Sequence, residues 1–390
     1  MKLGLTTQTS VQVGHHSLAM RKAKGNLSLF VLLCTIVFFE LIQLHFLNPW
    51  DSGESLTTLT TTTPSKFISL DDLTRSSYTS CNSDDLIYTH NIRGHDEASG
   101  LDRRIPKVIH QSGKTRCLTP NIANLTSQWR SLGYTYYFHD DEAVERLFQK
   151  DDWSIFPIQL YPLTKLCMPL FTLKADLWRY LMLWEYGGVY TDMDSIPTSF
   201  NASSIHDDDD GYFILDRTSI LSQWFIAVSP KHPLMYLTIL EVLNNILQVP
   251  DTGLTLPVIK TGPHALHSAM QRFMANVHVD IQSLTNSKVR QVRPLNATIY
   301  VGAGGRSLRV VGDYKYETEI VCRDVWDGRK ENALKLEEYR RMGMIHWIIV
   351  TRKENREKMK TNRSCRDMFV MEAMKQQAAG DNVDHNSQLV

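Results

Sequence analysis

The chain has 390 residues, 43% of them hydrophobic and 22% charged, which are ordinary proportions for a globular protein. Its 42 basic and 42 acidic residues cancel, so the formal net charge at pH 7 is zero. A balanced charge gives no sign of the basic surface on which nucleic-acid binding depends. The length allows one large domain or two small ones.

The first feature along the chain is a mostly apolar run at 27–47, about the length that a helix needs to cross a bilayer. Basic residues and no acidic ones precede it, whereas Asp51 and Glu54 follow it. By the positive-inside rule, 1–26 is then a cytosolic tail and the rest lies across the membrane. A cleaved signal peptide with its core at 27–39 is the alternative, but no clear cleavage site follows. We predict an uncleaved signal anchor.

Beyond the predicted anchor, 48–100 is rich in threonine, serine, aspartate and asparagine, which predicts an extended stem. Four glycosylation sequons agree with a lumenal domain without proving one. They start at Asn124, Asn201, Asn296 and Asn362. The cysteines after the anchor are Cys81, Cys117, Cys167, Cys322 and Cys365. An oxidising lumen would allow two disulfides among them, in a pairing that the sequence does not fix.

The predicted folded domain, 101–366, opens with an apolar run at 105–111 that is typical of a first strand. His110 and Gln111 stand at the carboxyl end of this strand. Ligands of open α/β sheets bind beyond such ends, so both side chains are candidate pocket residues. A buried strand-end histidine is an equally good interpretation of His110.

Helix and strand patterns then alternate. A helix is expected at 121–132, an aromatic strand at 134–138 and another helix at 142–149. Asp140 and Asp141 stand just before the last helix, and we interpret them as its N-cap rather than as metal ligands. The alternation favours an α/β fold.

The segment 170–194 holds the densest pattern in the chain. Apolar residues recur at three- and four-residue steps, at Leu170, Leu173, Leu177, Leu181 and Trp184. This spacing predicts a helix with one apolar face, on which Asp176 and Arg179 are surface neighbours. Gly187 and Gly188 then end the helix, and strand-forming residues follow.

The predicted strand leads into Asp192-Met193-Asp194. On an extended chain, side chains two residues apart point the same way, so the two carboxylates should face one spot. Like charges held that close repel unless a cation lies between them. Oxygen ligands suit Mn²⁺ or Mg²⁺, which take part of their coordination shell from a substrate phosphate. Solvated aspartates in a strand-end turn are the alternative.

The rest of the chain adds elements and two further candidates. Strands are expected at 212–215 and 224–228, and helices at 234–249 and 264–276, the last opened by Thr261-Gly262-Pro263. Four consecutive aspartates at 207–210 could form a second cation site, but a solvated loop is the commoner role. A last strand at 344–350 carries His346, and a polar tail follows at 367–390.

The helix, glycines and acids together closely resemble the Asp-x-Asp sugar transferases of the Golgi. That family includes initiating mannosyltransferases of fungal-type N-glycans and transferases that act on sphingolipids. Its shared pattern falls here on Ala175, Asp176, Arg179, Tyr180, Gly187, Gly188, Tyr190, Asp192 and Asp194. The Ile-Pro-Lys opening at 105–107 and the Thr-Gly-Pro at 261–263 are also similar.

The resemblance implies a GT-A nucleotide-diphospho-sugar transferase fold and a retaining, metal-dependent hexosyltransferase. The implied protein is a single-pass type II Golgi membrane protein that acts on a glycan or glycolipid. GDP-mannose is the first expected donor and a UDP-hexose such as UDP-galactose the second. A catalytically silent pseudoenzyme is the alternative from another class. A glycosidase is disfavoured, because it needs two carboxylates on separate elements across a cleft.

The resemblance also assigns roles. Asp194 would be the direct metal ligand, and Asp192 would contact donor hydroxyls and the metal through water. Arg179 would hold the diphosphate and Asp176 the donor sugar, with a local helical salt bridge as the alternative for this pair. Gly188 and Tyr190 would complete the donor pocket with the strand-end residues His110 and Gln111. His346 would be a third metal ligand, although the Gly-Ser-Trp that usually follows it is missing and a buried strand histidine stays open.

Overall fold

The computed structural model describes 68–94, 103–150, 153–168, 170–215, 220–248, 257–275, 291–292, 297–311, 322–324, 329–344 and residue 365. All of these residues belong to one compact unit, Thr63–Val390. The predicted cytosolic tail, anchor and polar C-terminal tail lie outside the described residues, and so does His346. No helix within the described ranges is long and apolar enough to cross a membrane.

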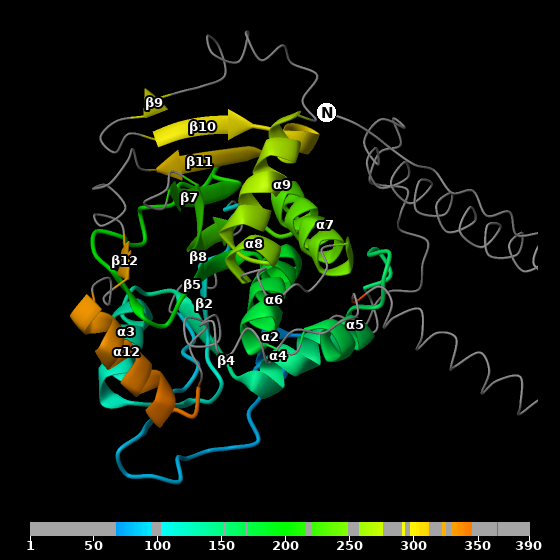
Figure 1. Ribbon diagram of the computed structural model, residues 1–390. Helices are drawn as coiled ribbons and strands as arrows, with labels where there is room; N and C mark the ends of the chain where they lie inside the picture. Colours follow the sequence, from blue (N-terminus) through cyan, green and yellow to red (C-terminus); the bar gives the residue numbers. More distant parts are fainter. Residues whose placement is uncertain are drawn as a thin grey trace, which may run out of the picture. The chain divides into compact units, whose positions relative to one another are not determined.

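The centre of the domain is a mixed eight-stranded sheet with the order β4-β2-β5-β8-β7-β11-β10-β9 (Figure 1). Its strands are β2 Val108–Ser112, β4 Thr135–His139, β5 Gly188–Thr191, β7 Gly211–Leu215, β8 Leu221–Val228, β9 Gln291–Val292, β10 Ala297–Val301 and β11 Ser307–Val311. β2 runs parallel to β4 and β5, and β8 runs antiparallel to β5 and β7. The predicted α/β class is therefore confirmed.

The helices are α2 Leu70–Leu73, α3 Pro120–Arg130, α4 Asp141–Phe148, α5 Leu160–Cys167, α6 Phe171–Tyr186, α7 Pro233–Gln248, α8 Pro257–Lys260, α9 Pro263–Ala275, η2 Ala303–Gly305 and α12 Arg329–Arg341. Short strand pairs join β1 Ile87–Tyr88 to β3 Cys117–Leu118, and β6 Ser195–Pro197 to β12 Cys322–Asp324. The Asp140 carboxylate caps α4 by accepting from the Ala143 amide, as predicted.

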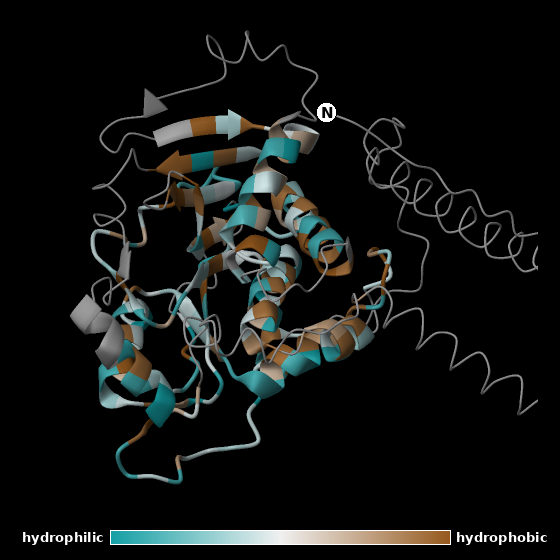
Figure 2. Ribbon diagram, viewed as in Figure 1, coloured by the Kyte–Doolittle hydropathy of each residue, from teal (hydrophilic) through white to brown (hydrophobic). Residues whose placement is uncertain are grey.

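Two hydrophobic cores occupy the two faces of the sheet. Along β8, Phe225 and Ala227 belong to the core that includes Trp129 of α3, whereas Ile226 and Val228 belong to the core around α6 and α7. Successive strand residues point to opposite faces, so an all-apolar strand fills both cores. Hydrophobic residues are frequent along the central strands and their flanking helices (Figure 2).

The helix α5 forms even though it contains a proline, Pro162. Pro162 stands in the first turn of α5, where a proline removes no helical hydrogen bond. A disulfide joins Cys167, the last residue of this helix, to Cys365.

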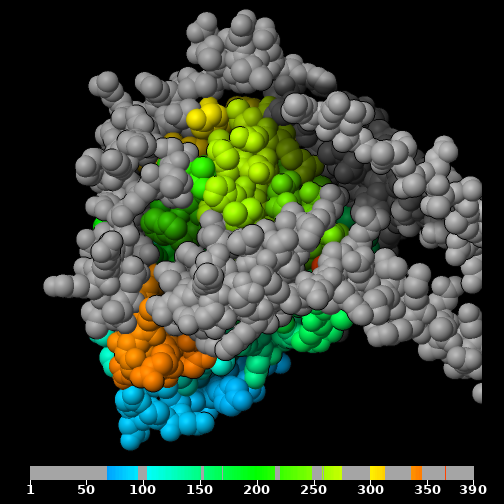
Figure 3. Space-filling model, in the orientation of Figure 1, coloured from blue at the N-terminus to red at the C-terminus, as the bar shows by residue number. Residues whose placement is uncertain are grey.

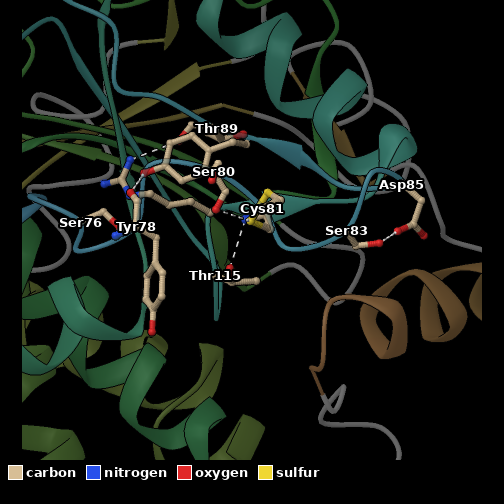
Figure 4. The surroundings of a disulfide bond; sticks show 11 residues. Ser76, Tyr78, Ser80, Cys81, Ser83, Asp85, Thr89 and Thr115 are labelled. Carbon is tan, nitrogen blue, oxygen red and sulfur yellow. Dashed lines mark hydrogen bonds between the residues drawn. A yellow bond between two sulfur atoms is a disulfide. The ribbon is translucent and has the colours of Figure 1, made fainter.

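The folded part also starts earlier than predicted, since 68–94 of the expected stem belongs to the domain. Leu73 is fully buried, β1 pairs with β3, and Cys81 forms a disulfide with Cys117 (Figure 4). Ile92 exchanges backbone hydrogen bonds with Tyr136 at the edge of the central sheet. The polar composition of 68–94 did not indicate that this segment folds, because it is attached by backbone pairing and a disulfide more than by apolar side chains.

Arg116 is the centre of that attachment. Its guanidinium is buried and forms an ion pair with Asp140 at 3.1 Å. The same group donates to the carbonyl oxygens of Thr74 and Phe138, both at 2.6 Å, and to the Thr89 carbonyl at 3.3 Å. One side chain therefore binds the N-terminal segment to β4 and to the start of α4.

Candidate active site

The site is built around the turn from α6 into β5. Gly187 and Gly188 adopt φ of 65° and 95°, a region that favours glycine. A Cβ on Gly188 would lie 2.8 Å from the Val108 carbonyl oxygen, and one on Gly187 would lie 2.7 Å from the Pro230 nitrogen. Only glycines fit this turn, which feeds β5 into the middle of the sheet between β2 and β8.

His110 contacts this turn through a hydrogen bond of its ring. It is fully buried, and its Nε2 lies 3.1 Å from the Gly187 carbonyl oxygen while its Nδ1 lies 3.0 Å from Nε2 of His139. Burial lowers the pKa of His110 to about 3, so the ring is neutral. Both ring nitrogens have protein partners, which favours the alternative of a buried strand-end histidine, and a donor contact of His110 stays a prediction.

Gln111 also supports the site instead of facing it. Its amide nitrogen donates to the Asp192 carbonyl oxygen at 3.1 Å, and its amide oxygen accepts from the Tyr136 hydroxyl at 2.8 Å. The side chain is buried and fixes the backbone where the first acid of the motif begins. The end of β2 thus holds the backbone of the motif in place, and the role of Gln111 as a pocket residue stays a prediction.

The acidic motif lies in a turn, which corrects the predicted extended geometry. The Ser195 amide and hydroxyl both donate to the Asp192 carbonyl oxygen, at 3.2 and 2.7 Å. The carboxylates nevertheless remain electrostatic neighbours. The pKa of Asp192 is raised to about 6, chiefly by desolvation; the positive charge of Arg179 opposes this shift and the negative charge of Asp194 adds to it.

Arg179 links two of the acids. Its guanidinium lies 3.1 Å from the Asp176 carboxylate and 3.3 Å from that of Asp192, and its centre is 4.5 Å from the middle of the Tyr190 ring. The Tyr190 hydroxyl donates to the same Asp192 oxygen at 2.7 Å. The local salt bridge between Asp176 and Arg179 is therefore real, and it is also part of a larger network.

Two residues of this network were missed by sequence reasoning. The Thr261 hydroxyl donates to Asp176 at 2.7 Å, and the Gln223 amide donates to it at 3.3 Å. The Gln223 carbonyl oxygen also accepts from Arg179 at 2.9 Å. Thr261 had a signal in the Thr-Gly-Pro triplet, whereas nothing in the local sequence marks Gln223 on β8.

Asp194, the second acid, is held by α12. The Lys335 ammonium lies 2.5 Å from its carboxylate, and the Tyr339 hydroxyl donates to it at 3.0 Å. The Lys335 side chain is 9% exposed and that of Asp194 is 5% exposed. Neither partner carried a sequence signal, because Tyr339 and Asp194 are 145 residues apart.

The donor set fits a divalent metal. Asp192 and Asp194 offer hard oxygen ligands, the negative charge of Asp194 helps to raise the pKa of Asp192, and the Lys335 ammonium already pairs with Asp194. Mn²⁺ or Mg²⁺ would be held by these two residues. The predicted third ligand, His346, lies outside the described residues.

A second group of potential ligands consists of His206, Asp208 and Asp209, whose ligand atoms lie within 4.8 Å of one another. Arg309 donates from Nε to both oxygens of Asp209, at 2.9 and 3.1 Å. Asp210 is buried between Arg104 and Arg306, at 2.7 and 3.0 Å. The predicted solvated loop thus holds for Asp207 and Asp208, while the next two aspartates are ion-paired.

Comparison with known proteins agrees with this site. Residues 114–209 match the family "glycosyltransferase sugar-binding region containing DXD motif". This range includes Asp176, Arg179, Asp192 and Asp194, so the resemblance predicted from the sequence is confirmed.

Two relatives come from Schizosaccharomyces pombe. The initiation-specific alpha-1,6-mannosyltransferase is 29% identical over 172 residues, which are 38% of this chain and 42% of that protein. Inositol phosphoceramide mannosyltransferase 3 is 28% identical over 113 residues, 28% of this chain and 30% of that protein. Each match therefore spans less than half of the relative. The structure of the PaToxG glycosyltransferase aligns with a TM-score of 0.34 and 16% identity, covering 47% of this chain and 74% of that chain, too low to bear on the fold.

Proposed function

We propose that this member of the DXD-motif glycosyltransferases is a metal-dependent, retaining hexosyltransferase with a GT-A fold. Its first donor would be GDP-mannose and its second a UDP-hexose, with a glycan or glycolipid as acceptor. The observation that carries the proposal is the network in which buried Asp176 and Arg179 join the partly exposed Asp192, beside Asp194. We further propose that the chain is a type II membrane protein of the Golgi.

The network is suited to hold a charged donor. Arg179 is fixed by two carboxylates, so its planar guanidinium is oriented before any ligand arrives. Asp176 is fixed in turn by Thr261 and Gln223, which keeps a hydrogen-bond acceptor in place for sugar hydroxyls. A fixed polar environment lowers the cost of reorganisation during the reaction.

Departure of the nucleoside diphosphate is the main electrostatic task, because glycosyl transfer passes through a state with positive charge on the sugar. A divalent metal, when bound, supplies positive charge to the leaving diphosphate. Asp192 and Asp194 would hold that ion. Tyr190 and Arg179 orient the Asp192 carboxylate through its shared oxygen.

The two S. pombe relatives are both mannosyltransferases by name, and this supports mannose as the first sugar. A nucleotide-sugar screen tests the proposal. The full-length chain, purified in mild detergent with Mn²⁺, should slowly hydrolyse GDP-mannose or a UDP-hexose and should stop when EDTA is added.

A matched pair of substitutions ties that activity to the site. Asp192→Asn should abolish hydrolysis, whereas Asp207→Asn, the same chemical change on an exposed loop residue, should leave it unchanged. Turnover of a UDP-hexose alone would select the second donor. Failure of every donor with every divalent metal would refute the enzyme and favour the pseudoenzyme.

A further inference from the structure

We propose that Lys335 is a further donor-binding residue, which holds Asp194 while the site is free of donor and contacts the diphosphate when metal and donor are bound. This inference rests on the proposed function. It assigns a role to α12, which lies far along the chain from the acidic motif.

The position of Lys335 is fixed by its helix. Lys335 and Tyr339 are four residues apart, so their side chains project from the same face of α12, and both reach Asp194. With 9% of its side chain exposed, Lys335 is enclosed rather than a mobile surface lysine.

The rest of α12 is attached to the domain at its C-terminal end. The Asn121 amide on α3 donates to Glu338 at 2.9 Å, and Lys114 donates to the Gly343 carbonyl oxygen at 2.7 Å. Arg341 pairs with Asp85 at 2.9 Å, which places α12 against the N-terminal segment (Figure 3). These contacts keep the ammonium at the acidic motif.

The balance of charge around the acidic motif links Lys335 to metal and donor binding. Asp176, Asp192 and Asp194 carry three negative charges, and Arg179 and Lys335 carry two positive ones, so these five side chains hold one negative charge in excess. A cation that binds Asp194 competes with the ammonium for the same carboxylate. An ammonium that is displaced from this carboxylate can form a new charge-assisted contact with another anion that binds beside it.

A nucleoside diphosphate can provide that anion. In the proposed function its phosphates lie against the metal at Asp194, within the neighbourhood of the Lys335 side chain. Lys335 would then exchange one anionic partner for another without becoming exposed. Its loss should therefore have opposite effects on two binding steps, which a merely structural lysine would not produce.

The test measures binding to the full-length chain in two separate titrations. Mn²⁺ alone is titrated first, with free Mn²⁺ followed by electron paramagnetic resonance, and GDP or UDP is then titrated at saturating Mn²⁺ by calorimetry. In Lys335→Met, Mn²⁺ should bind about tenfold more tightly, and the nucleotide about tenfold more weakly, the size of one charge-assisted contact.

Three further variants sharpen the result. Arg340→Met removes an exposed charge from the same helix and should change neither constant. Lys335→Arg should restore nucleotide binding. Tyr339→Phe loosens the hold on Asp194 without changing charge, and should tighten Mn²⁺ binding modestly even if Lys335→Met is poorly folded.

The outcomes separate this inference from the proposed function. If the parent chain binds Mn²⁺ and turns over a donor while Lys335→Met shows unchanged constants, the inference is refuted and the function stands. If the parent chain turns over no donor but Lys335→Met gains Mn²⁺ affinity and loses nucleotide affinity, the inference stands and the function is refuted. Weaker Mn²⁺ binding in Lys335→Met would also refute the inference about Lys335.

Discussion

Replacing Asp194 by asparagine should do more than remove a metal ligand. The substitution takes away the carboxylate against which the Lys335 ammonium is packed, at 2.5 Å and with both side chains at least nine-tenths enclosed. The lysine then keeps its charge in a poorly solvated place. Removing one partner of such a pair costs about 3 kcal/mol of unfolding free energy, at the low end of the range for buried ion pairs.

The expected shift can be measured directly. For a domain of more than about 250 residues, about 3 kcal/mol corresponds to a fall of roughly 4–6 °C in melting temperature. The assay is thermal unfolding followed by tryptophan fluorescence, at pH 7.5 in EDTA so that bound metal does not contribute. The double variant Asp194→Asn/Lys335→Met removes the stranded charge, so it should recover most of the loss.

Two results would refute this reasoning. One is a melting temperature for Asp194→Asn within about 1 °C of the parent chain, which is what a solvated aspartate predicts. The other is a double variant whose loss equals the sum of the two single losses, because independent sites add.

Three more predictions follow from individual contacts. Arg116→Met should destabilise the chain by about 3 kcal/mol in urea unfolding, since it strands Asp140 and several carbonyls, whereas the exposed Arg93→Met should cost under about 1 kcal/mol; equal losses would contradict the assignment. Gly188→Ala should cost about 3 kcal/mol or more by the same assay, because it combines φ of 95° with a backbone contact at 2.8 Å, and a neutral effect would show that β5 can shift. Asp192→Asn should raise the free energy of unfolding in EDTA above pH 6, by about 1 kcal/mol after allowance for its partial exposure, and the gain should vanish near pH 4.

The sign of the Asp192 prediction follows from proton binding. Its pKa is raised from 3.8 to about 6 in the folded chain, so between these values the folded state holds a proton that the unfolded state has lost. Stability therefore falls as pH rises through this window, and a neutral asparagine avoids the loss. A gain that grew toward pH 4 would contradict the shift.

Local patterns in the sequence predicted the parts of the site that are local. The apolar spacing of α6, the two glycines and the strand that follows them are all encoded within one segment, and the structure has them there. The Asp140 cap was predicted for the same reason. These features need only neighbours in the sequence to be recognised.

The missed features depend on distant partners. Gln223 and Lys335 complete the network from β8 and α12, and no local periodicity distinguishes them from other polar residues. His110 could be placed at the strand end, but its burial depends on His139 of the neighbouring strand. The turn at Asp192 depends on Ser195, whose hydroxyl and amide both donate to the Asp192 carbonyl oxygen. The prediction of an extended chain did not include these hydrogen bonds.

The fastening of the N-terminal segment by Arg116 bears on how this protein can be handled in the laboratory. A recombinant fragment cut at residue 101 would lack Cys81 and the Thr74 and Thr89 carbonyls, leaving a sulfhydryl on Cys117 and the Arg116 guanidinium without these two acceptors. The Ile68 carbonyl also accepts from the Tyr186 hydroxyl, at the end of the helix that precedes the active-site turn. Expression should therefore begin upstream of Ile68, in a host that oxidises thiols.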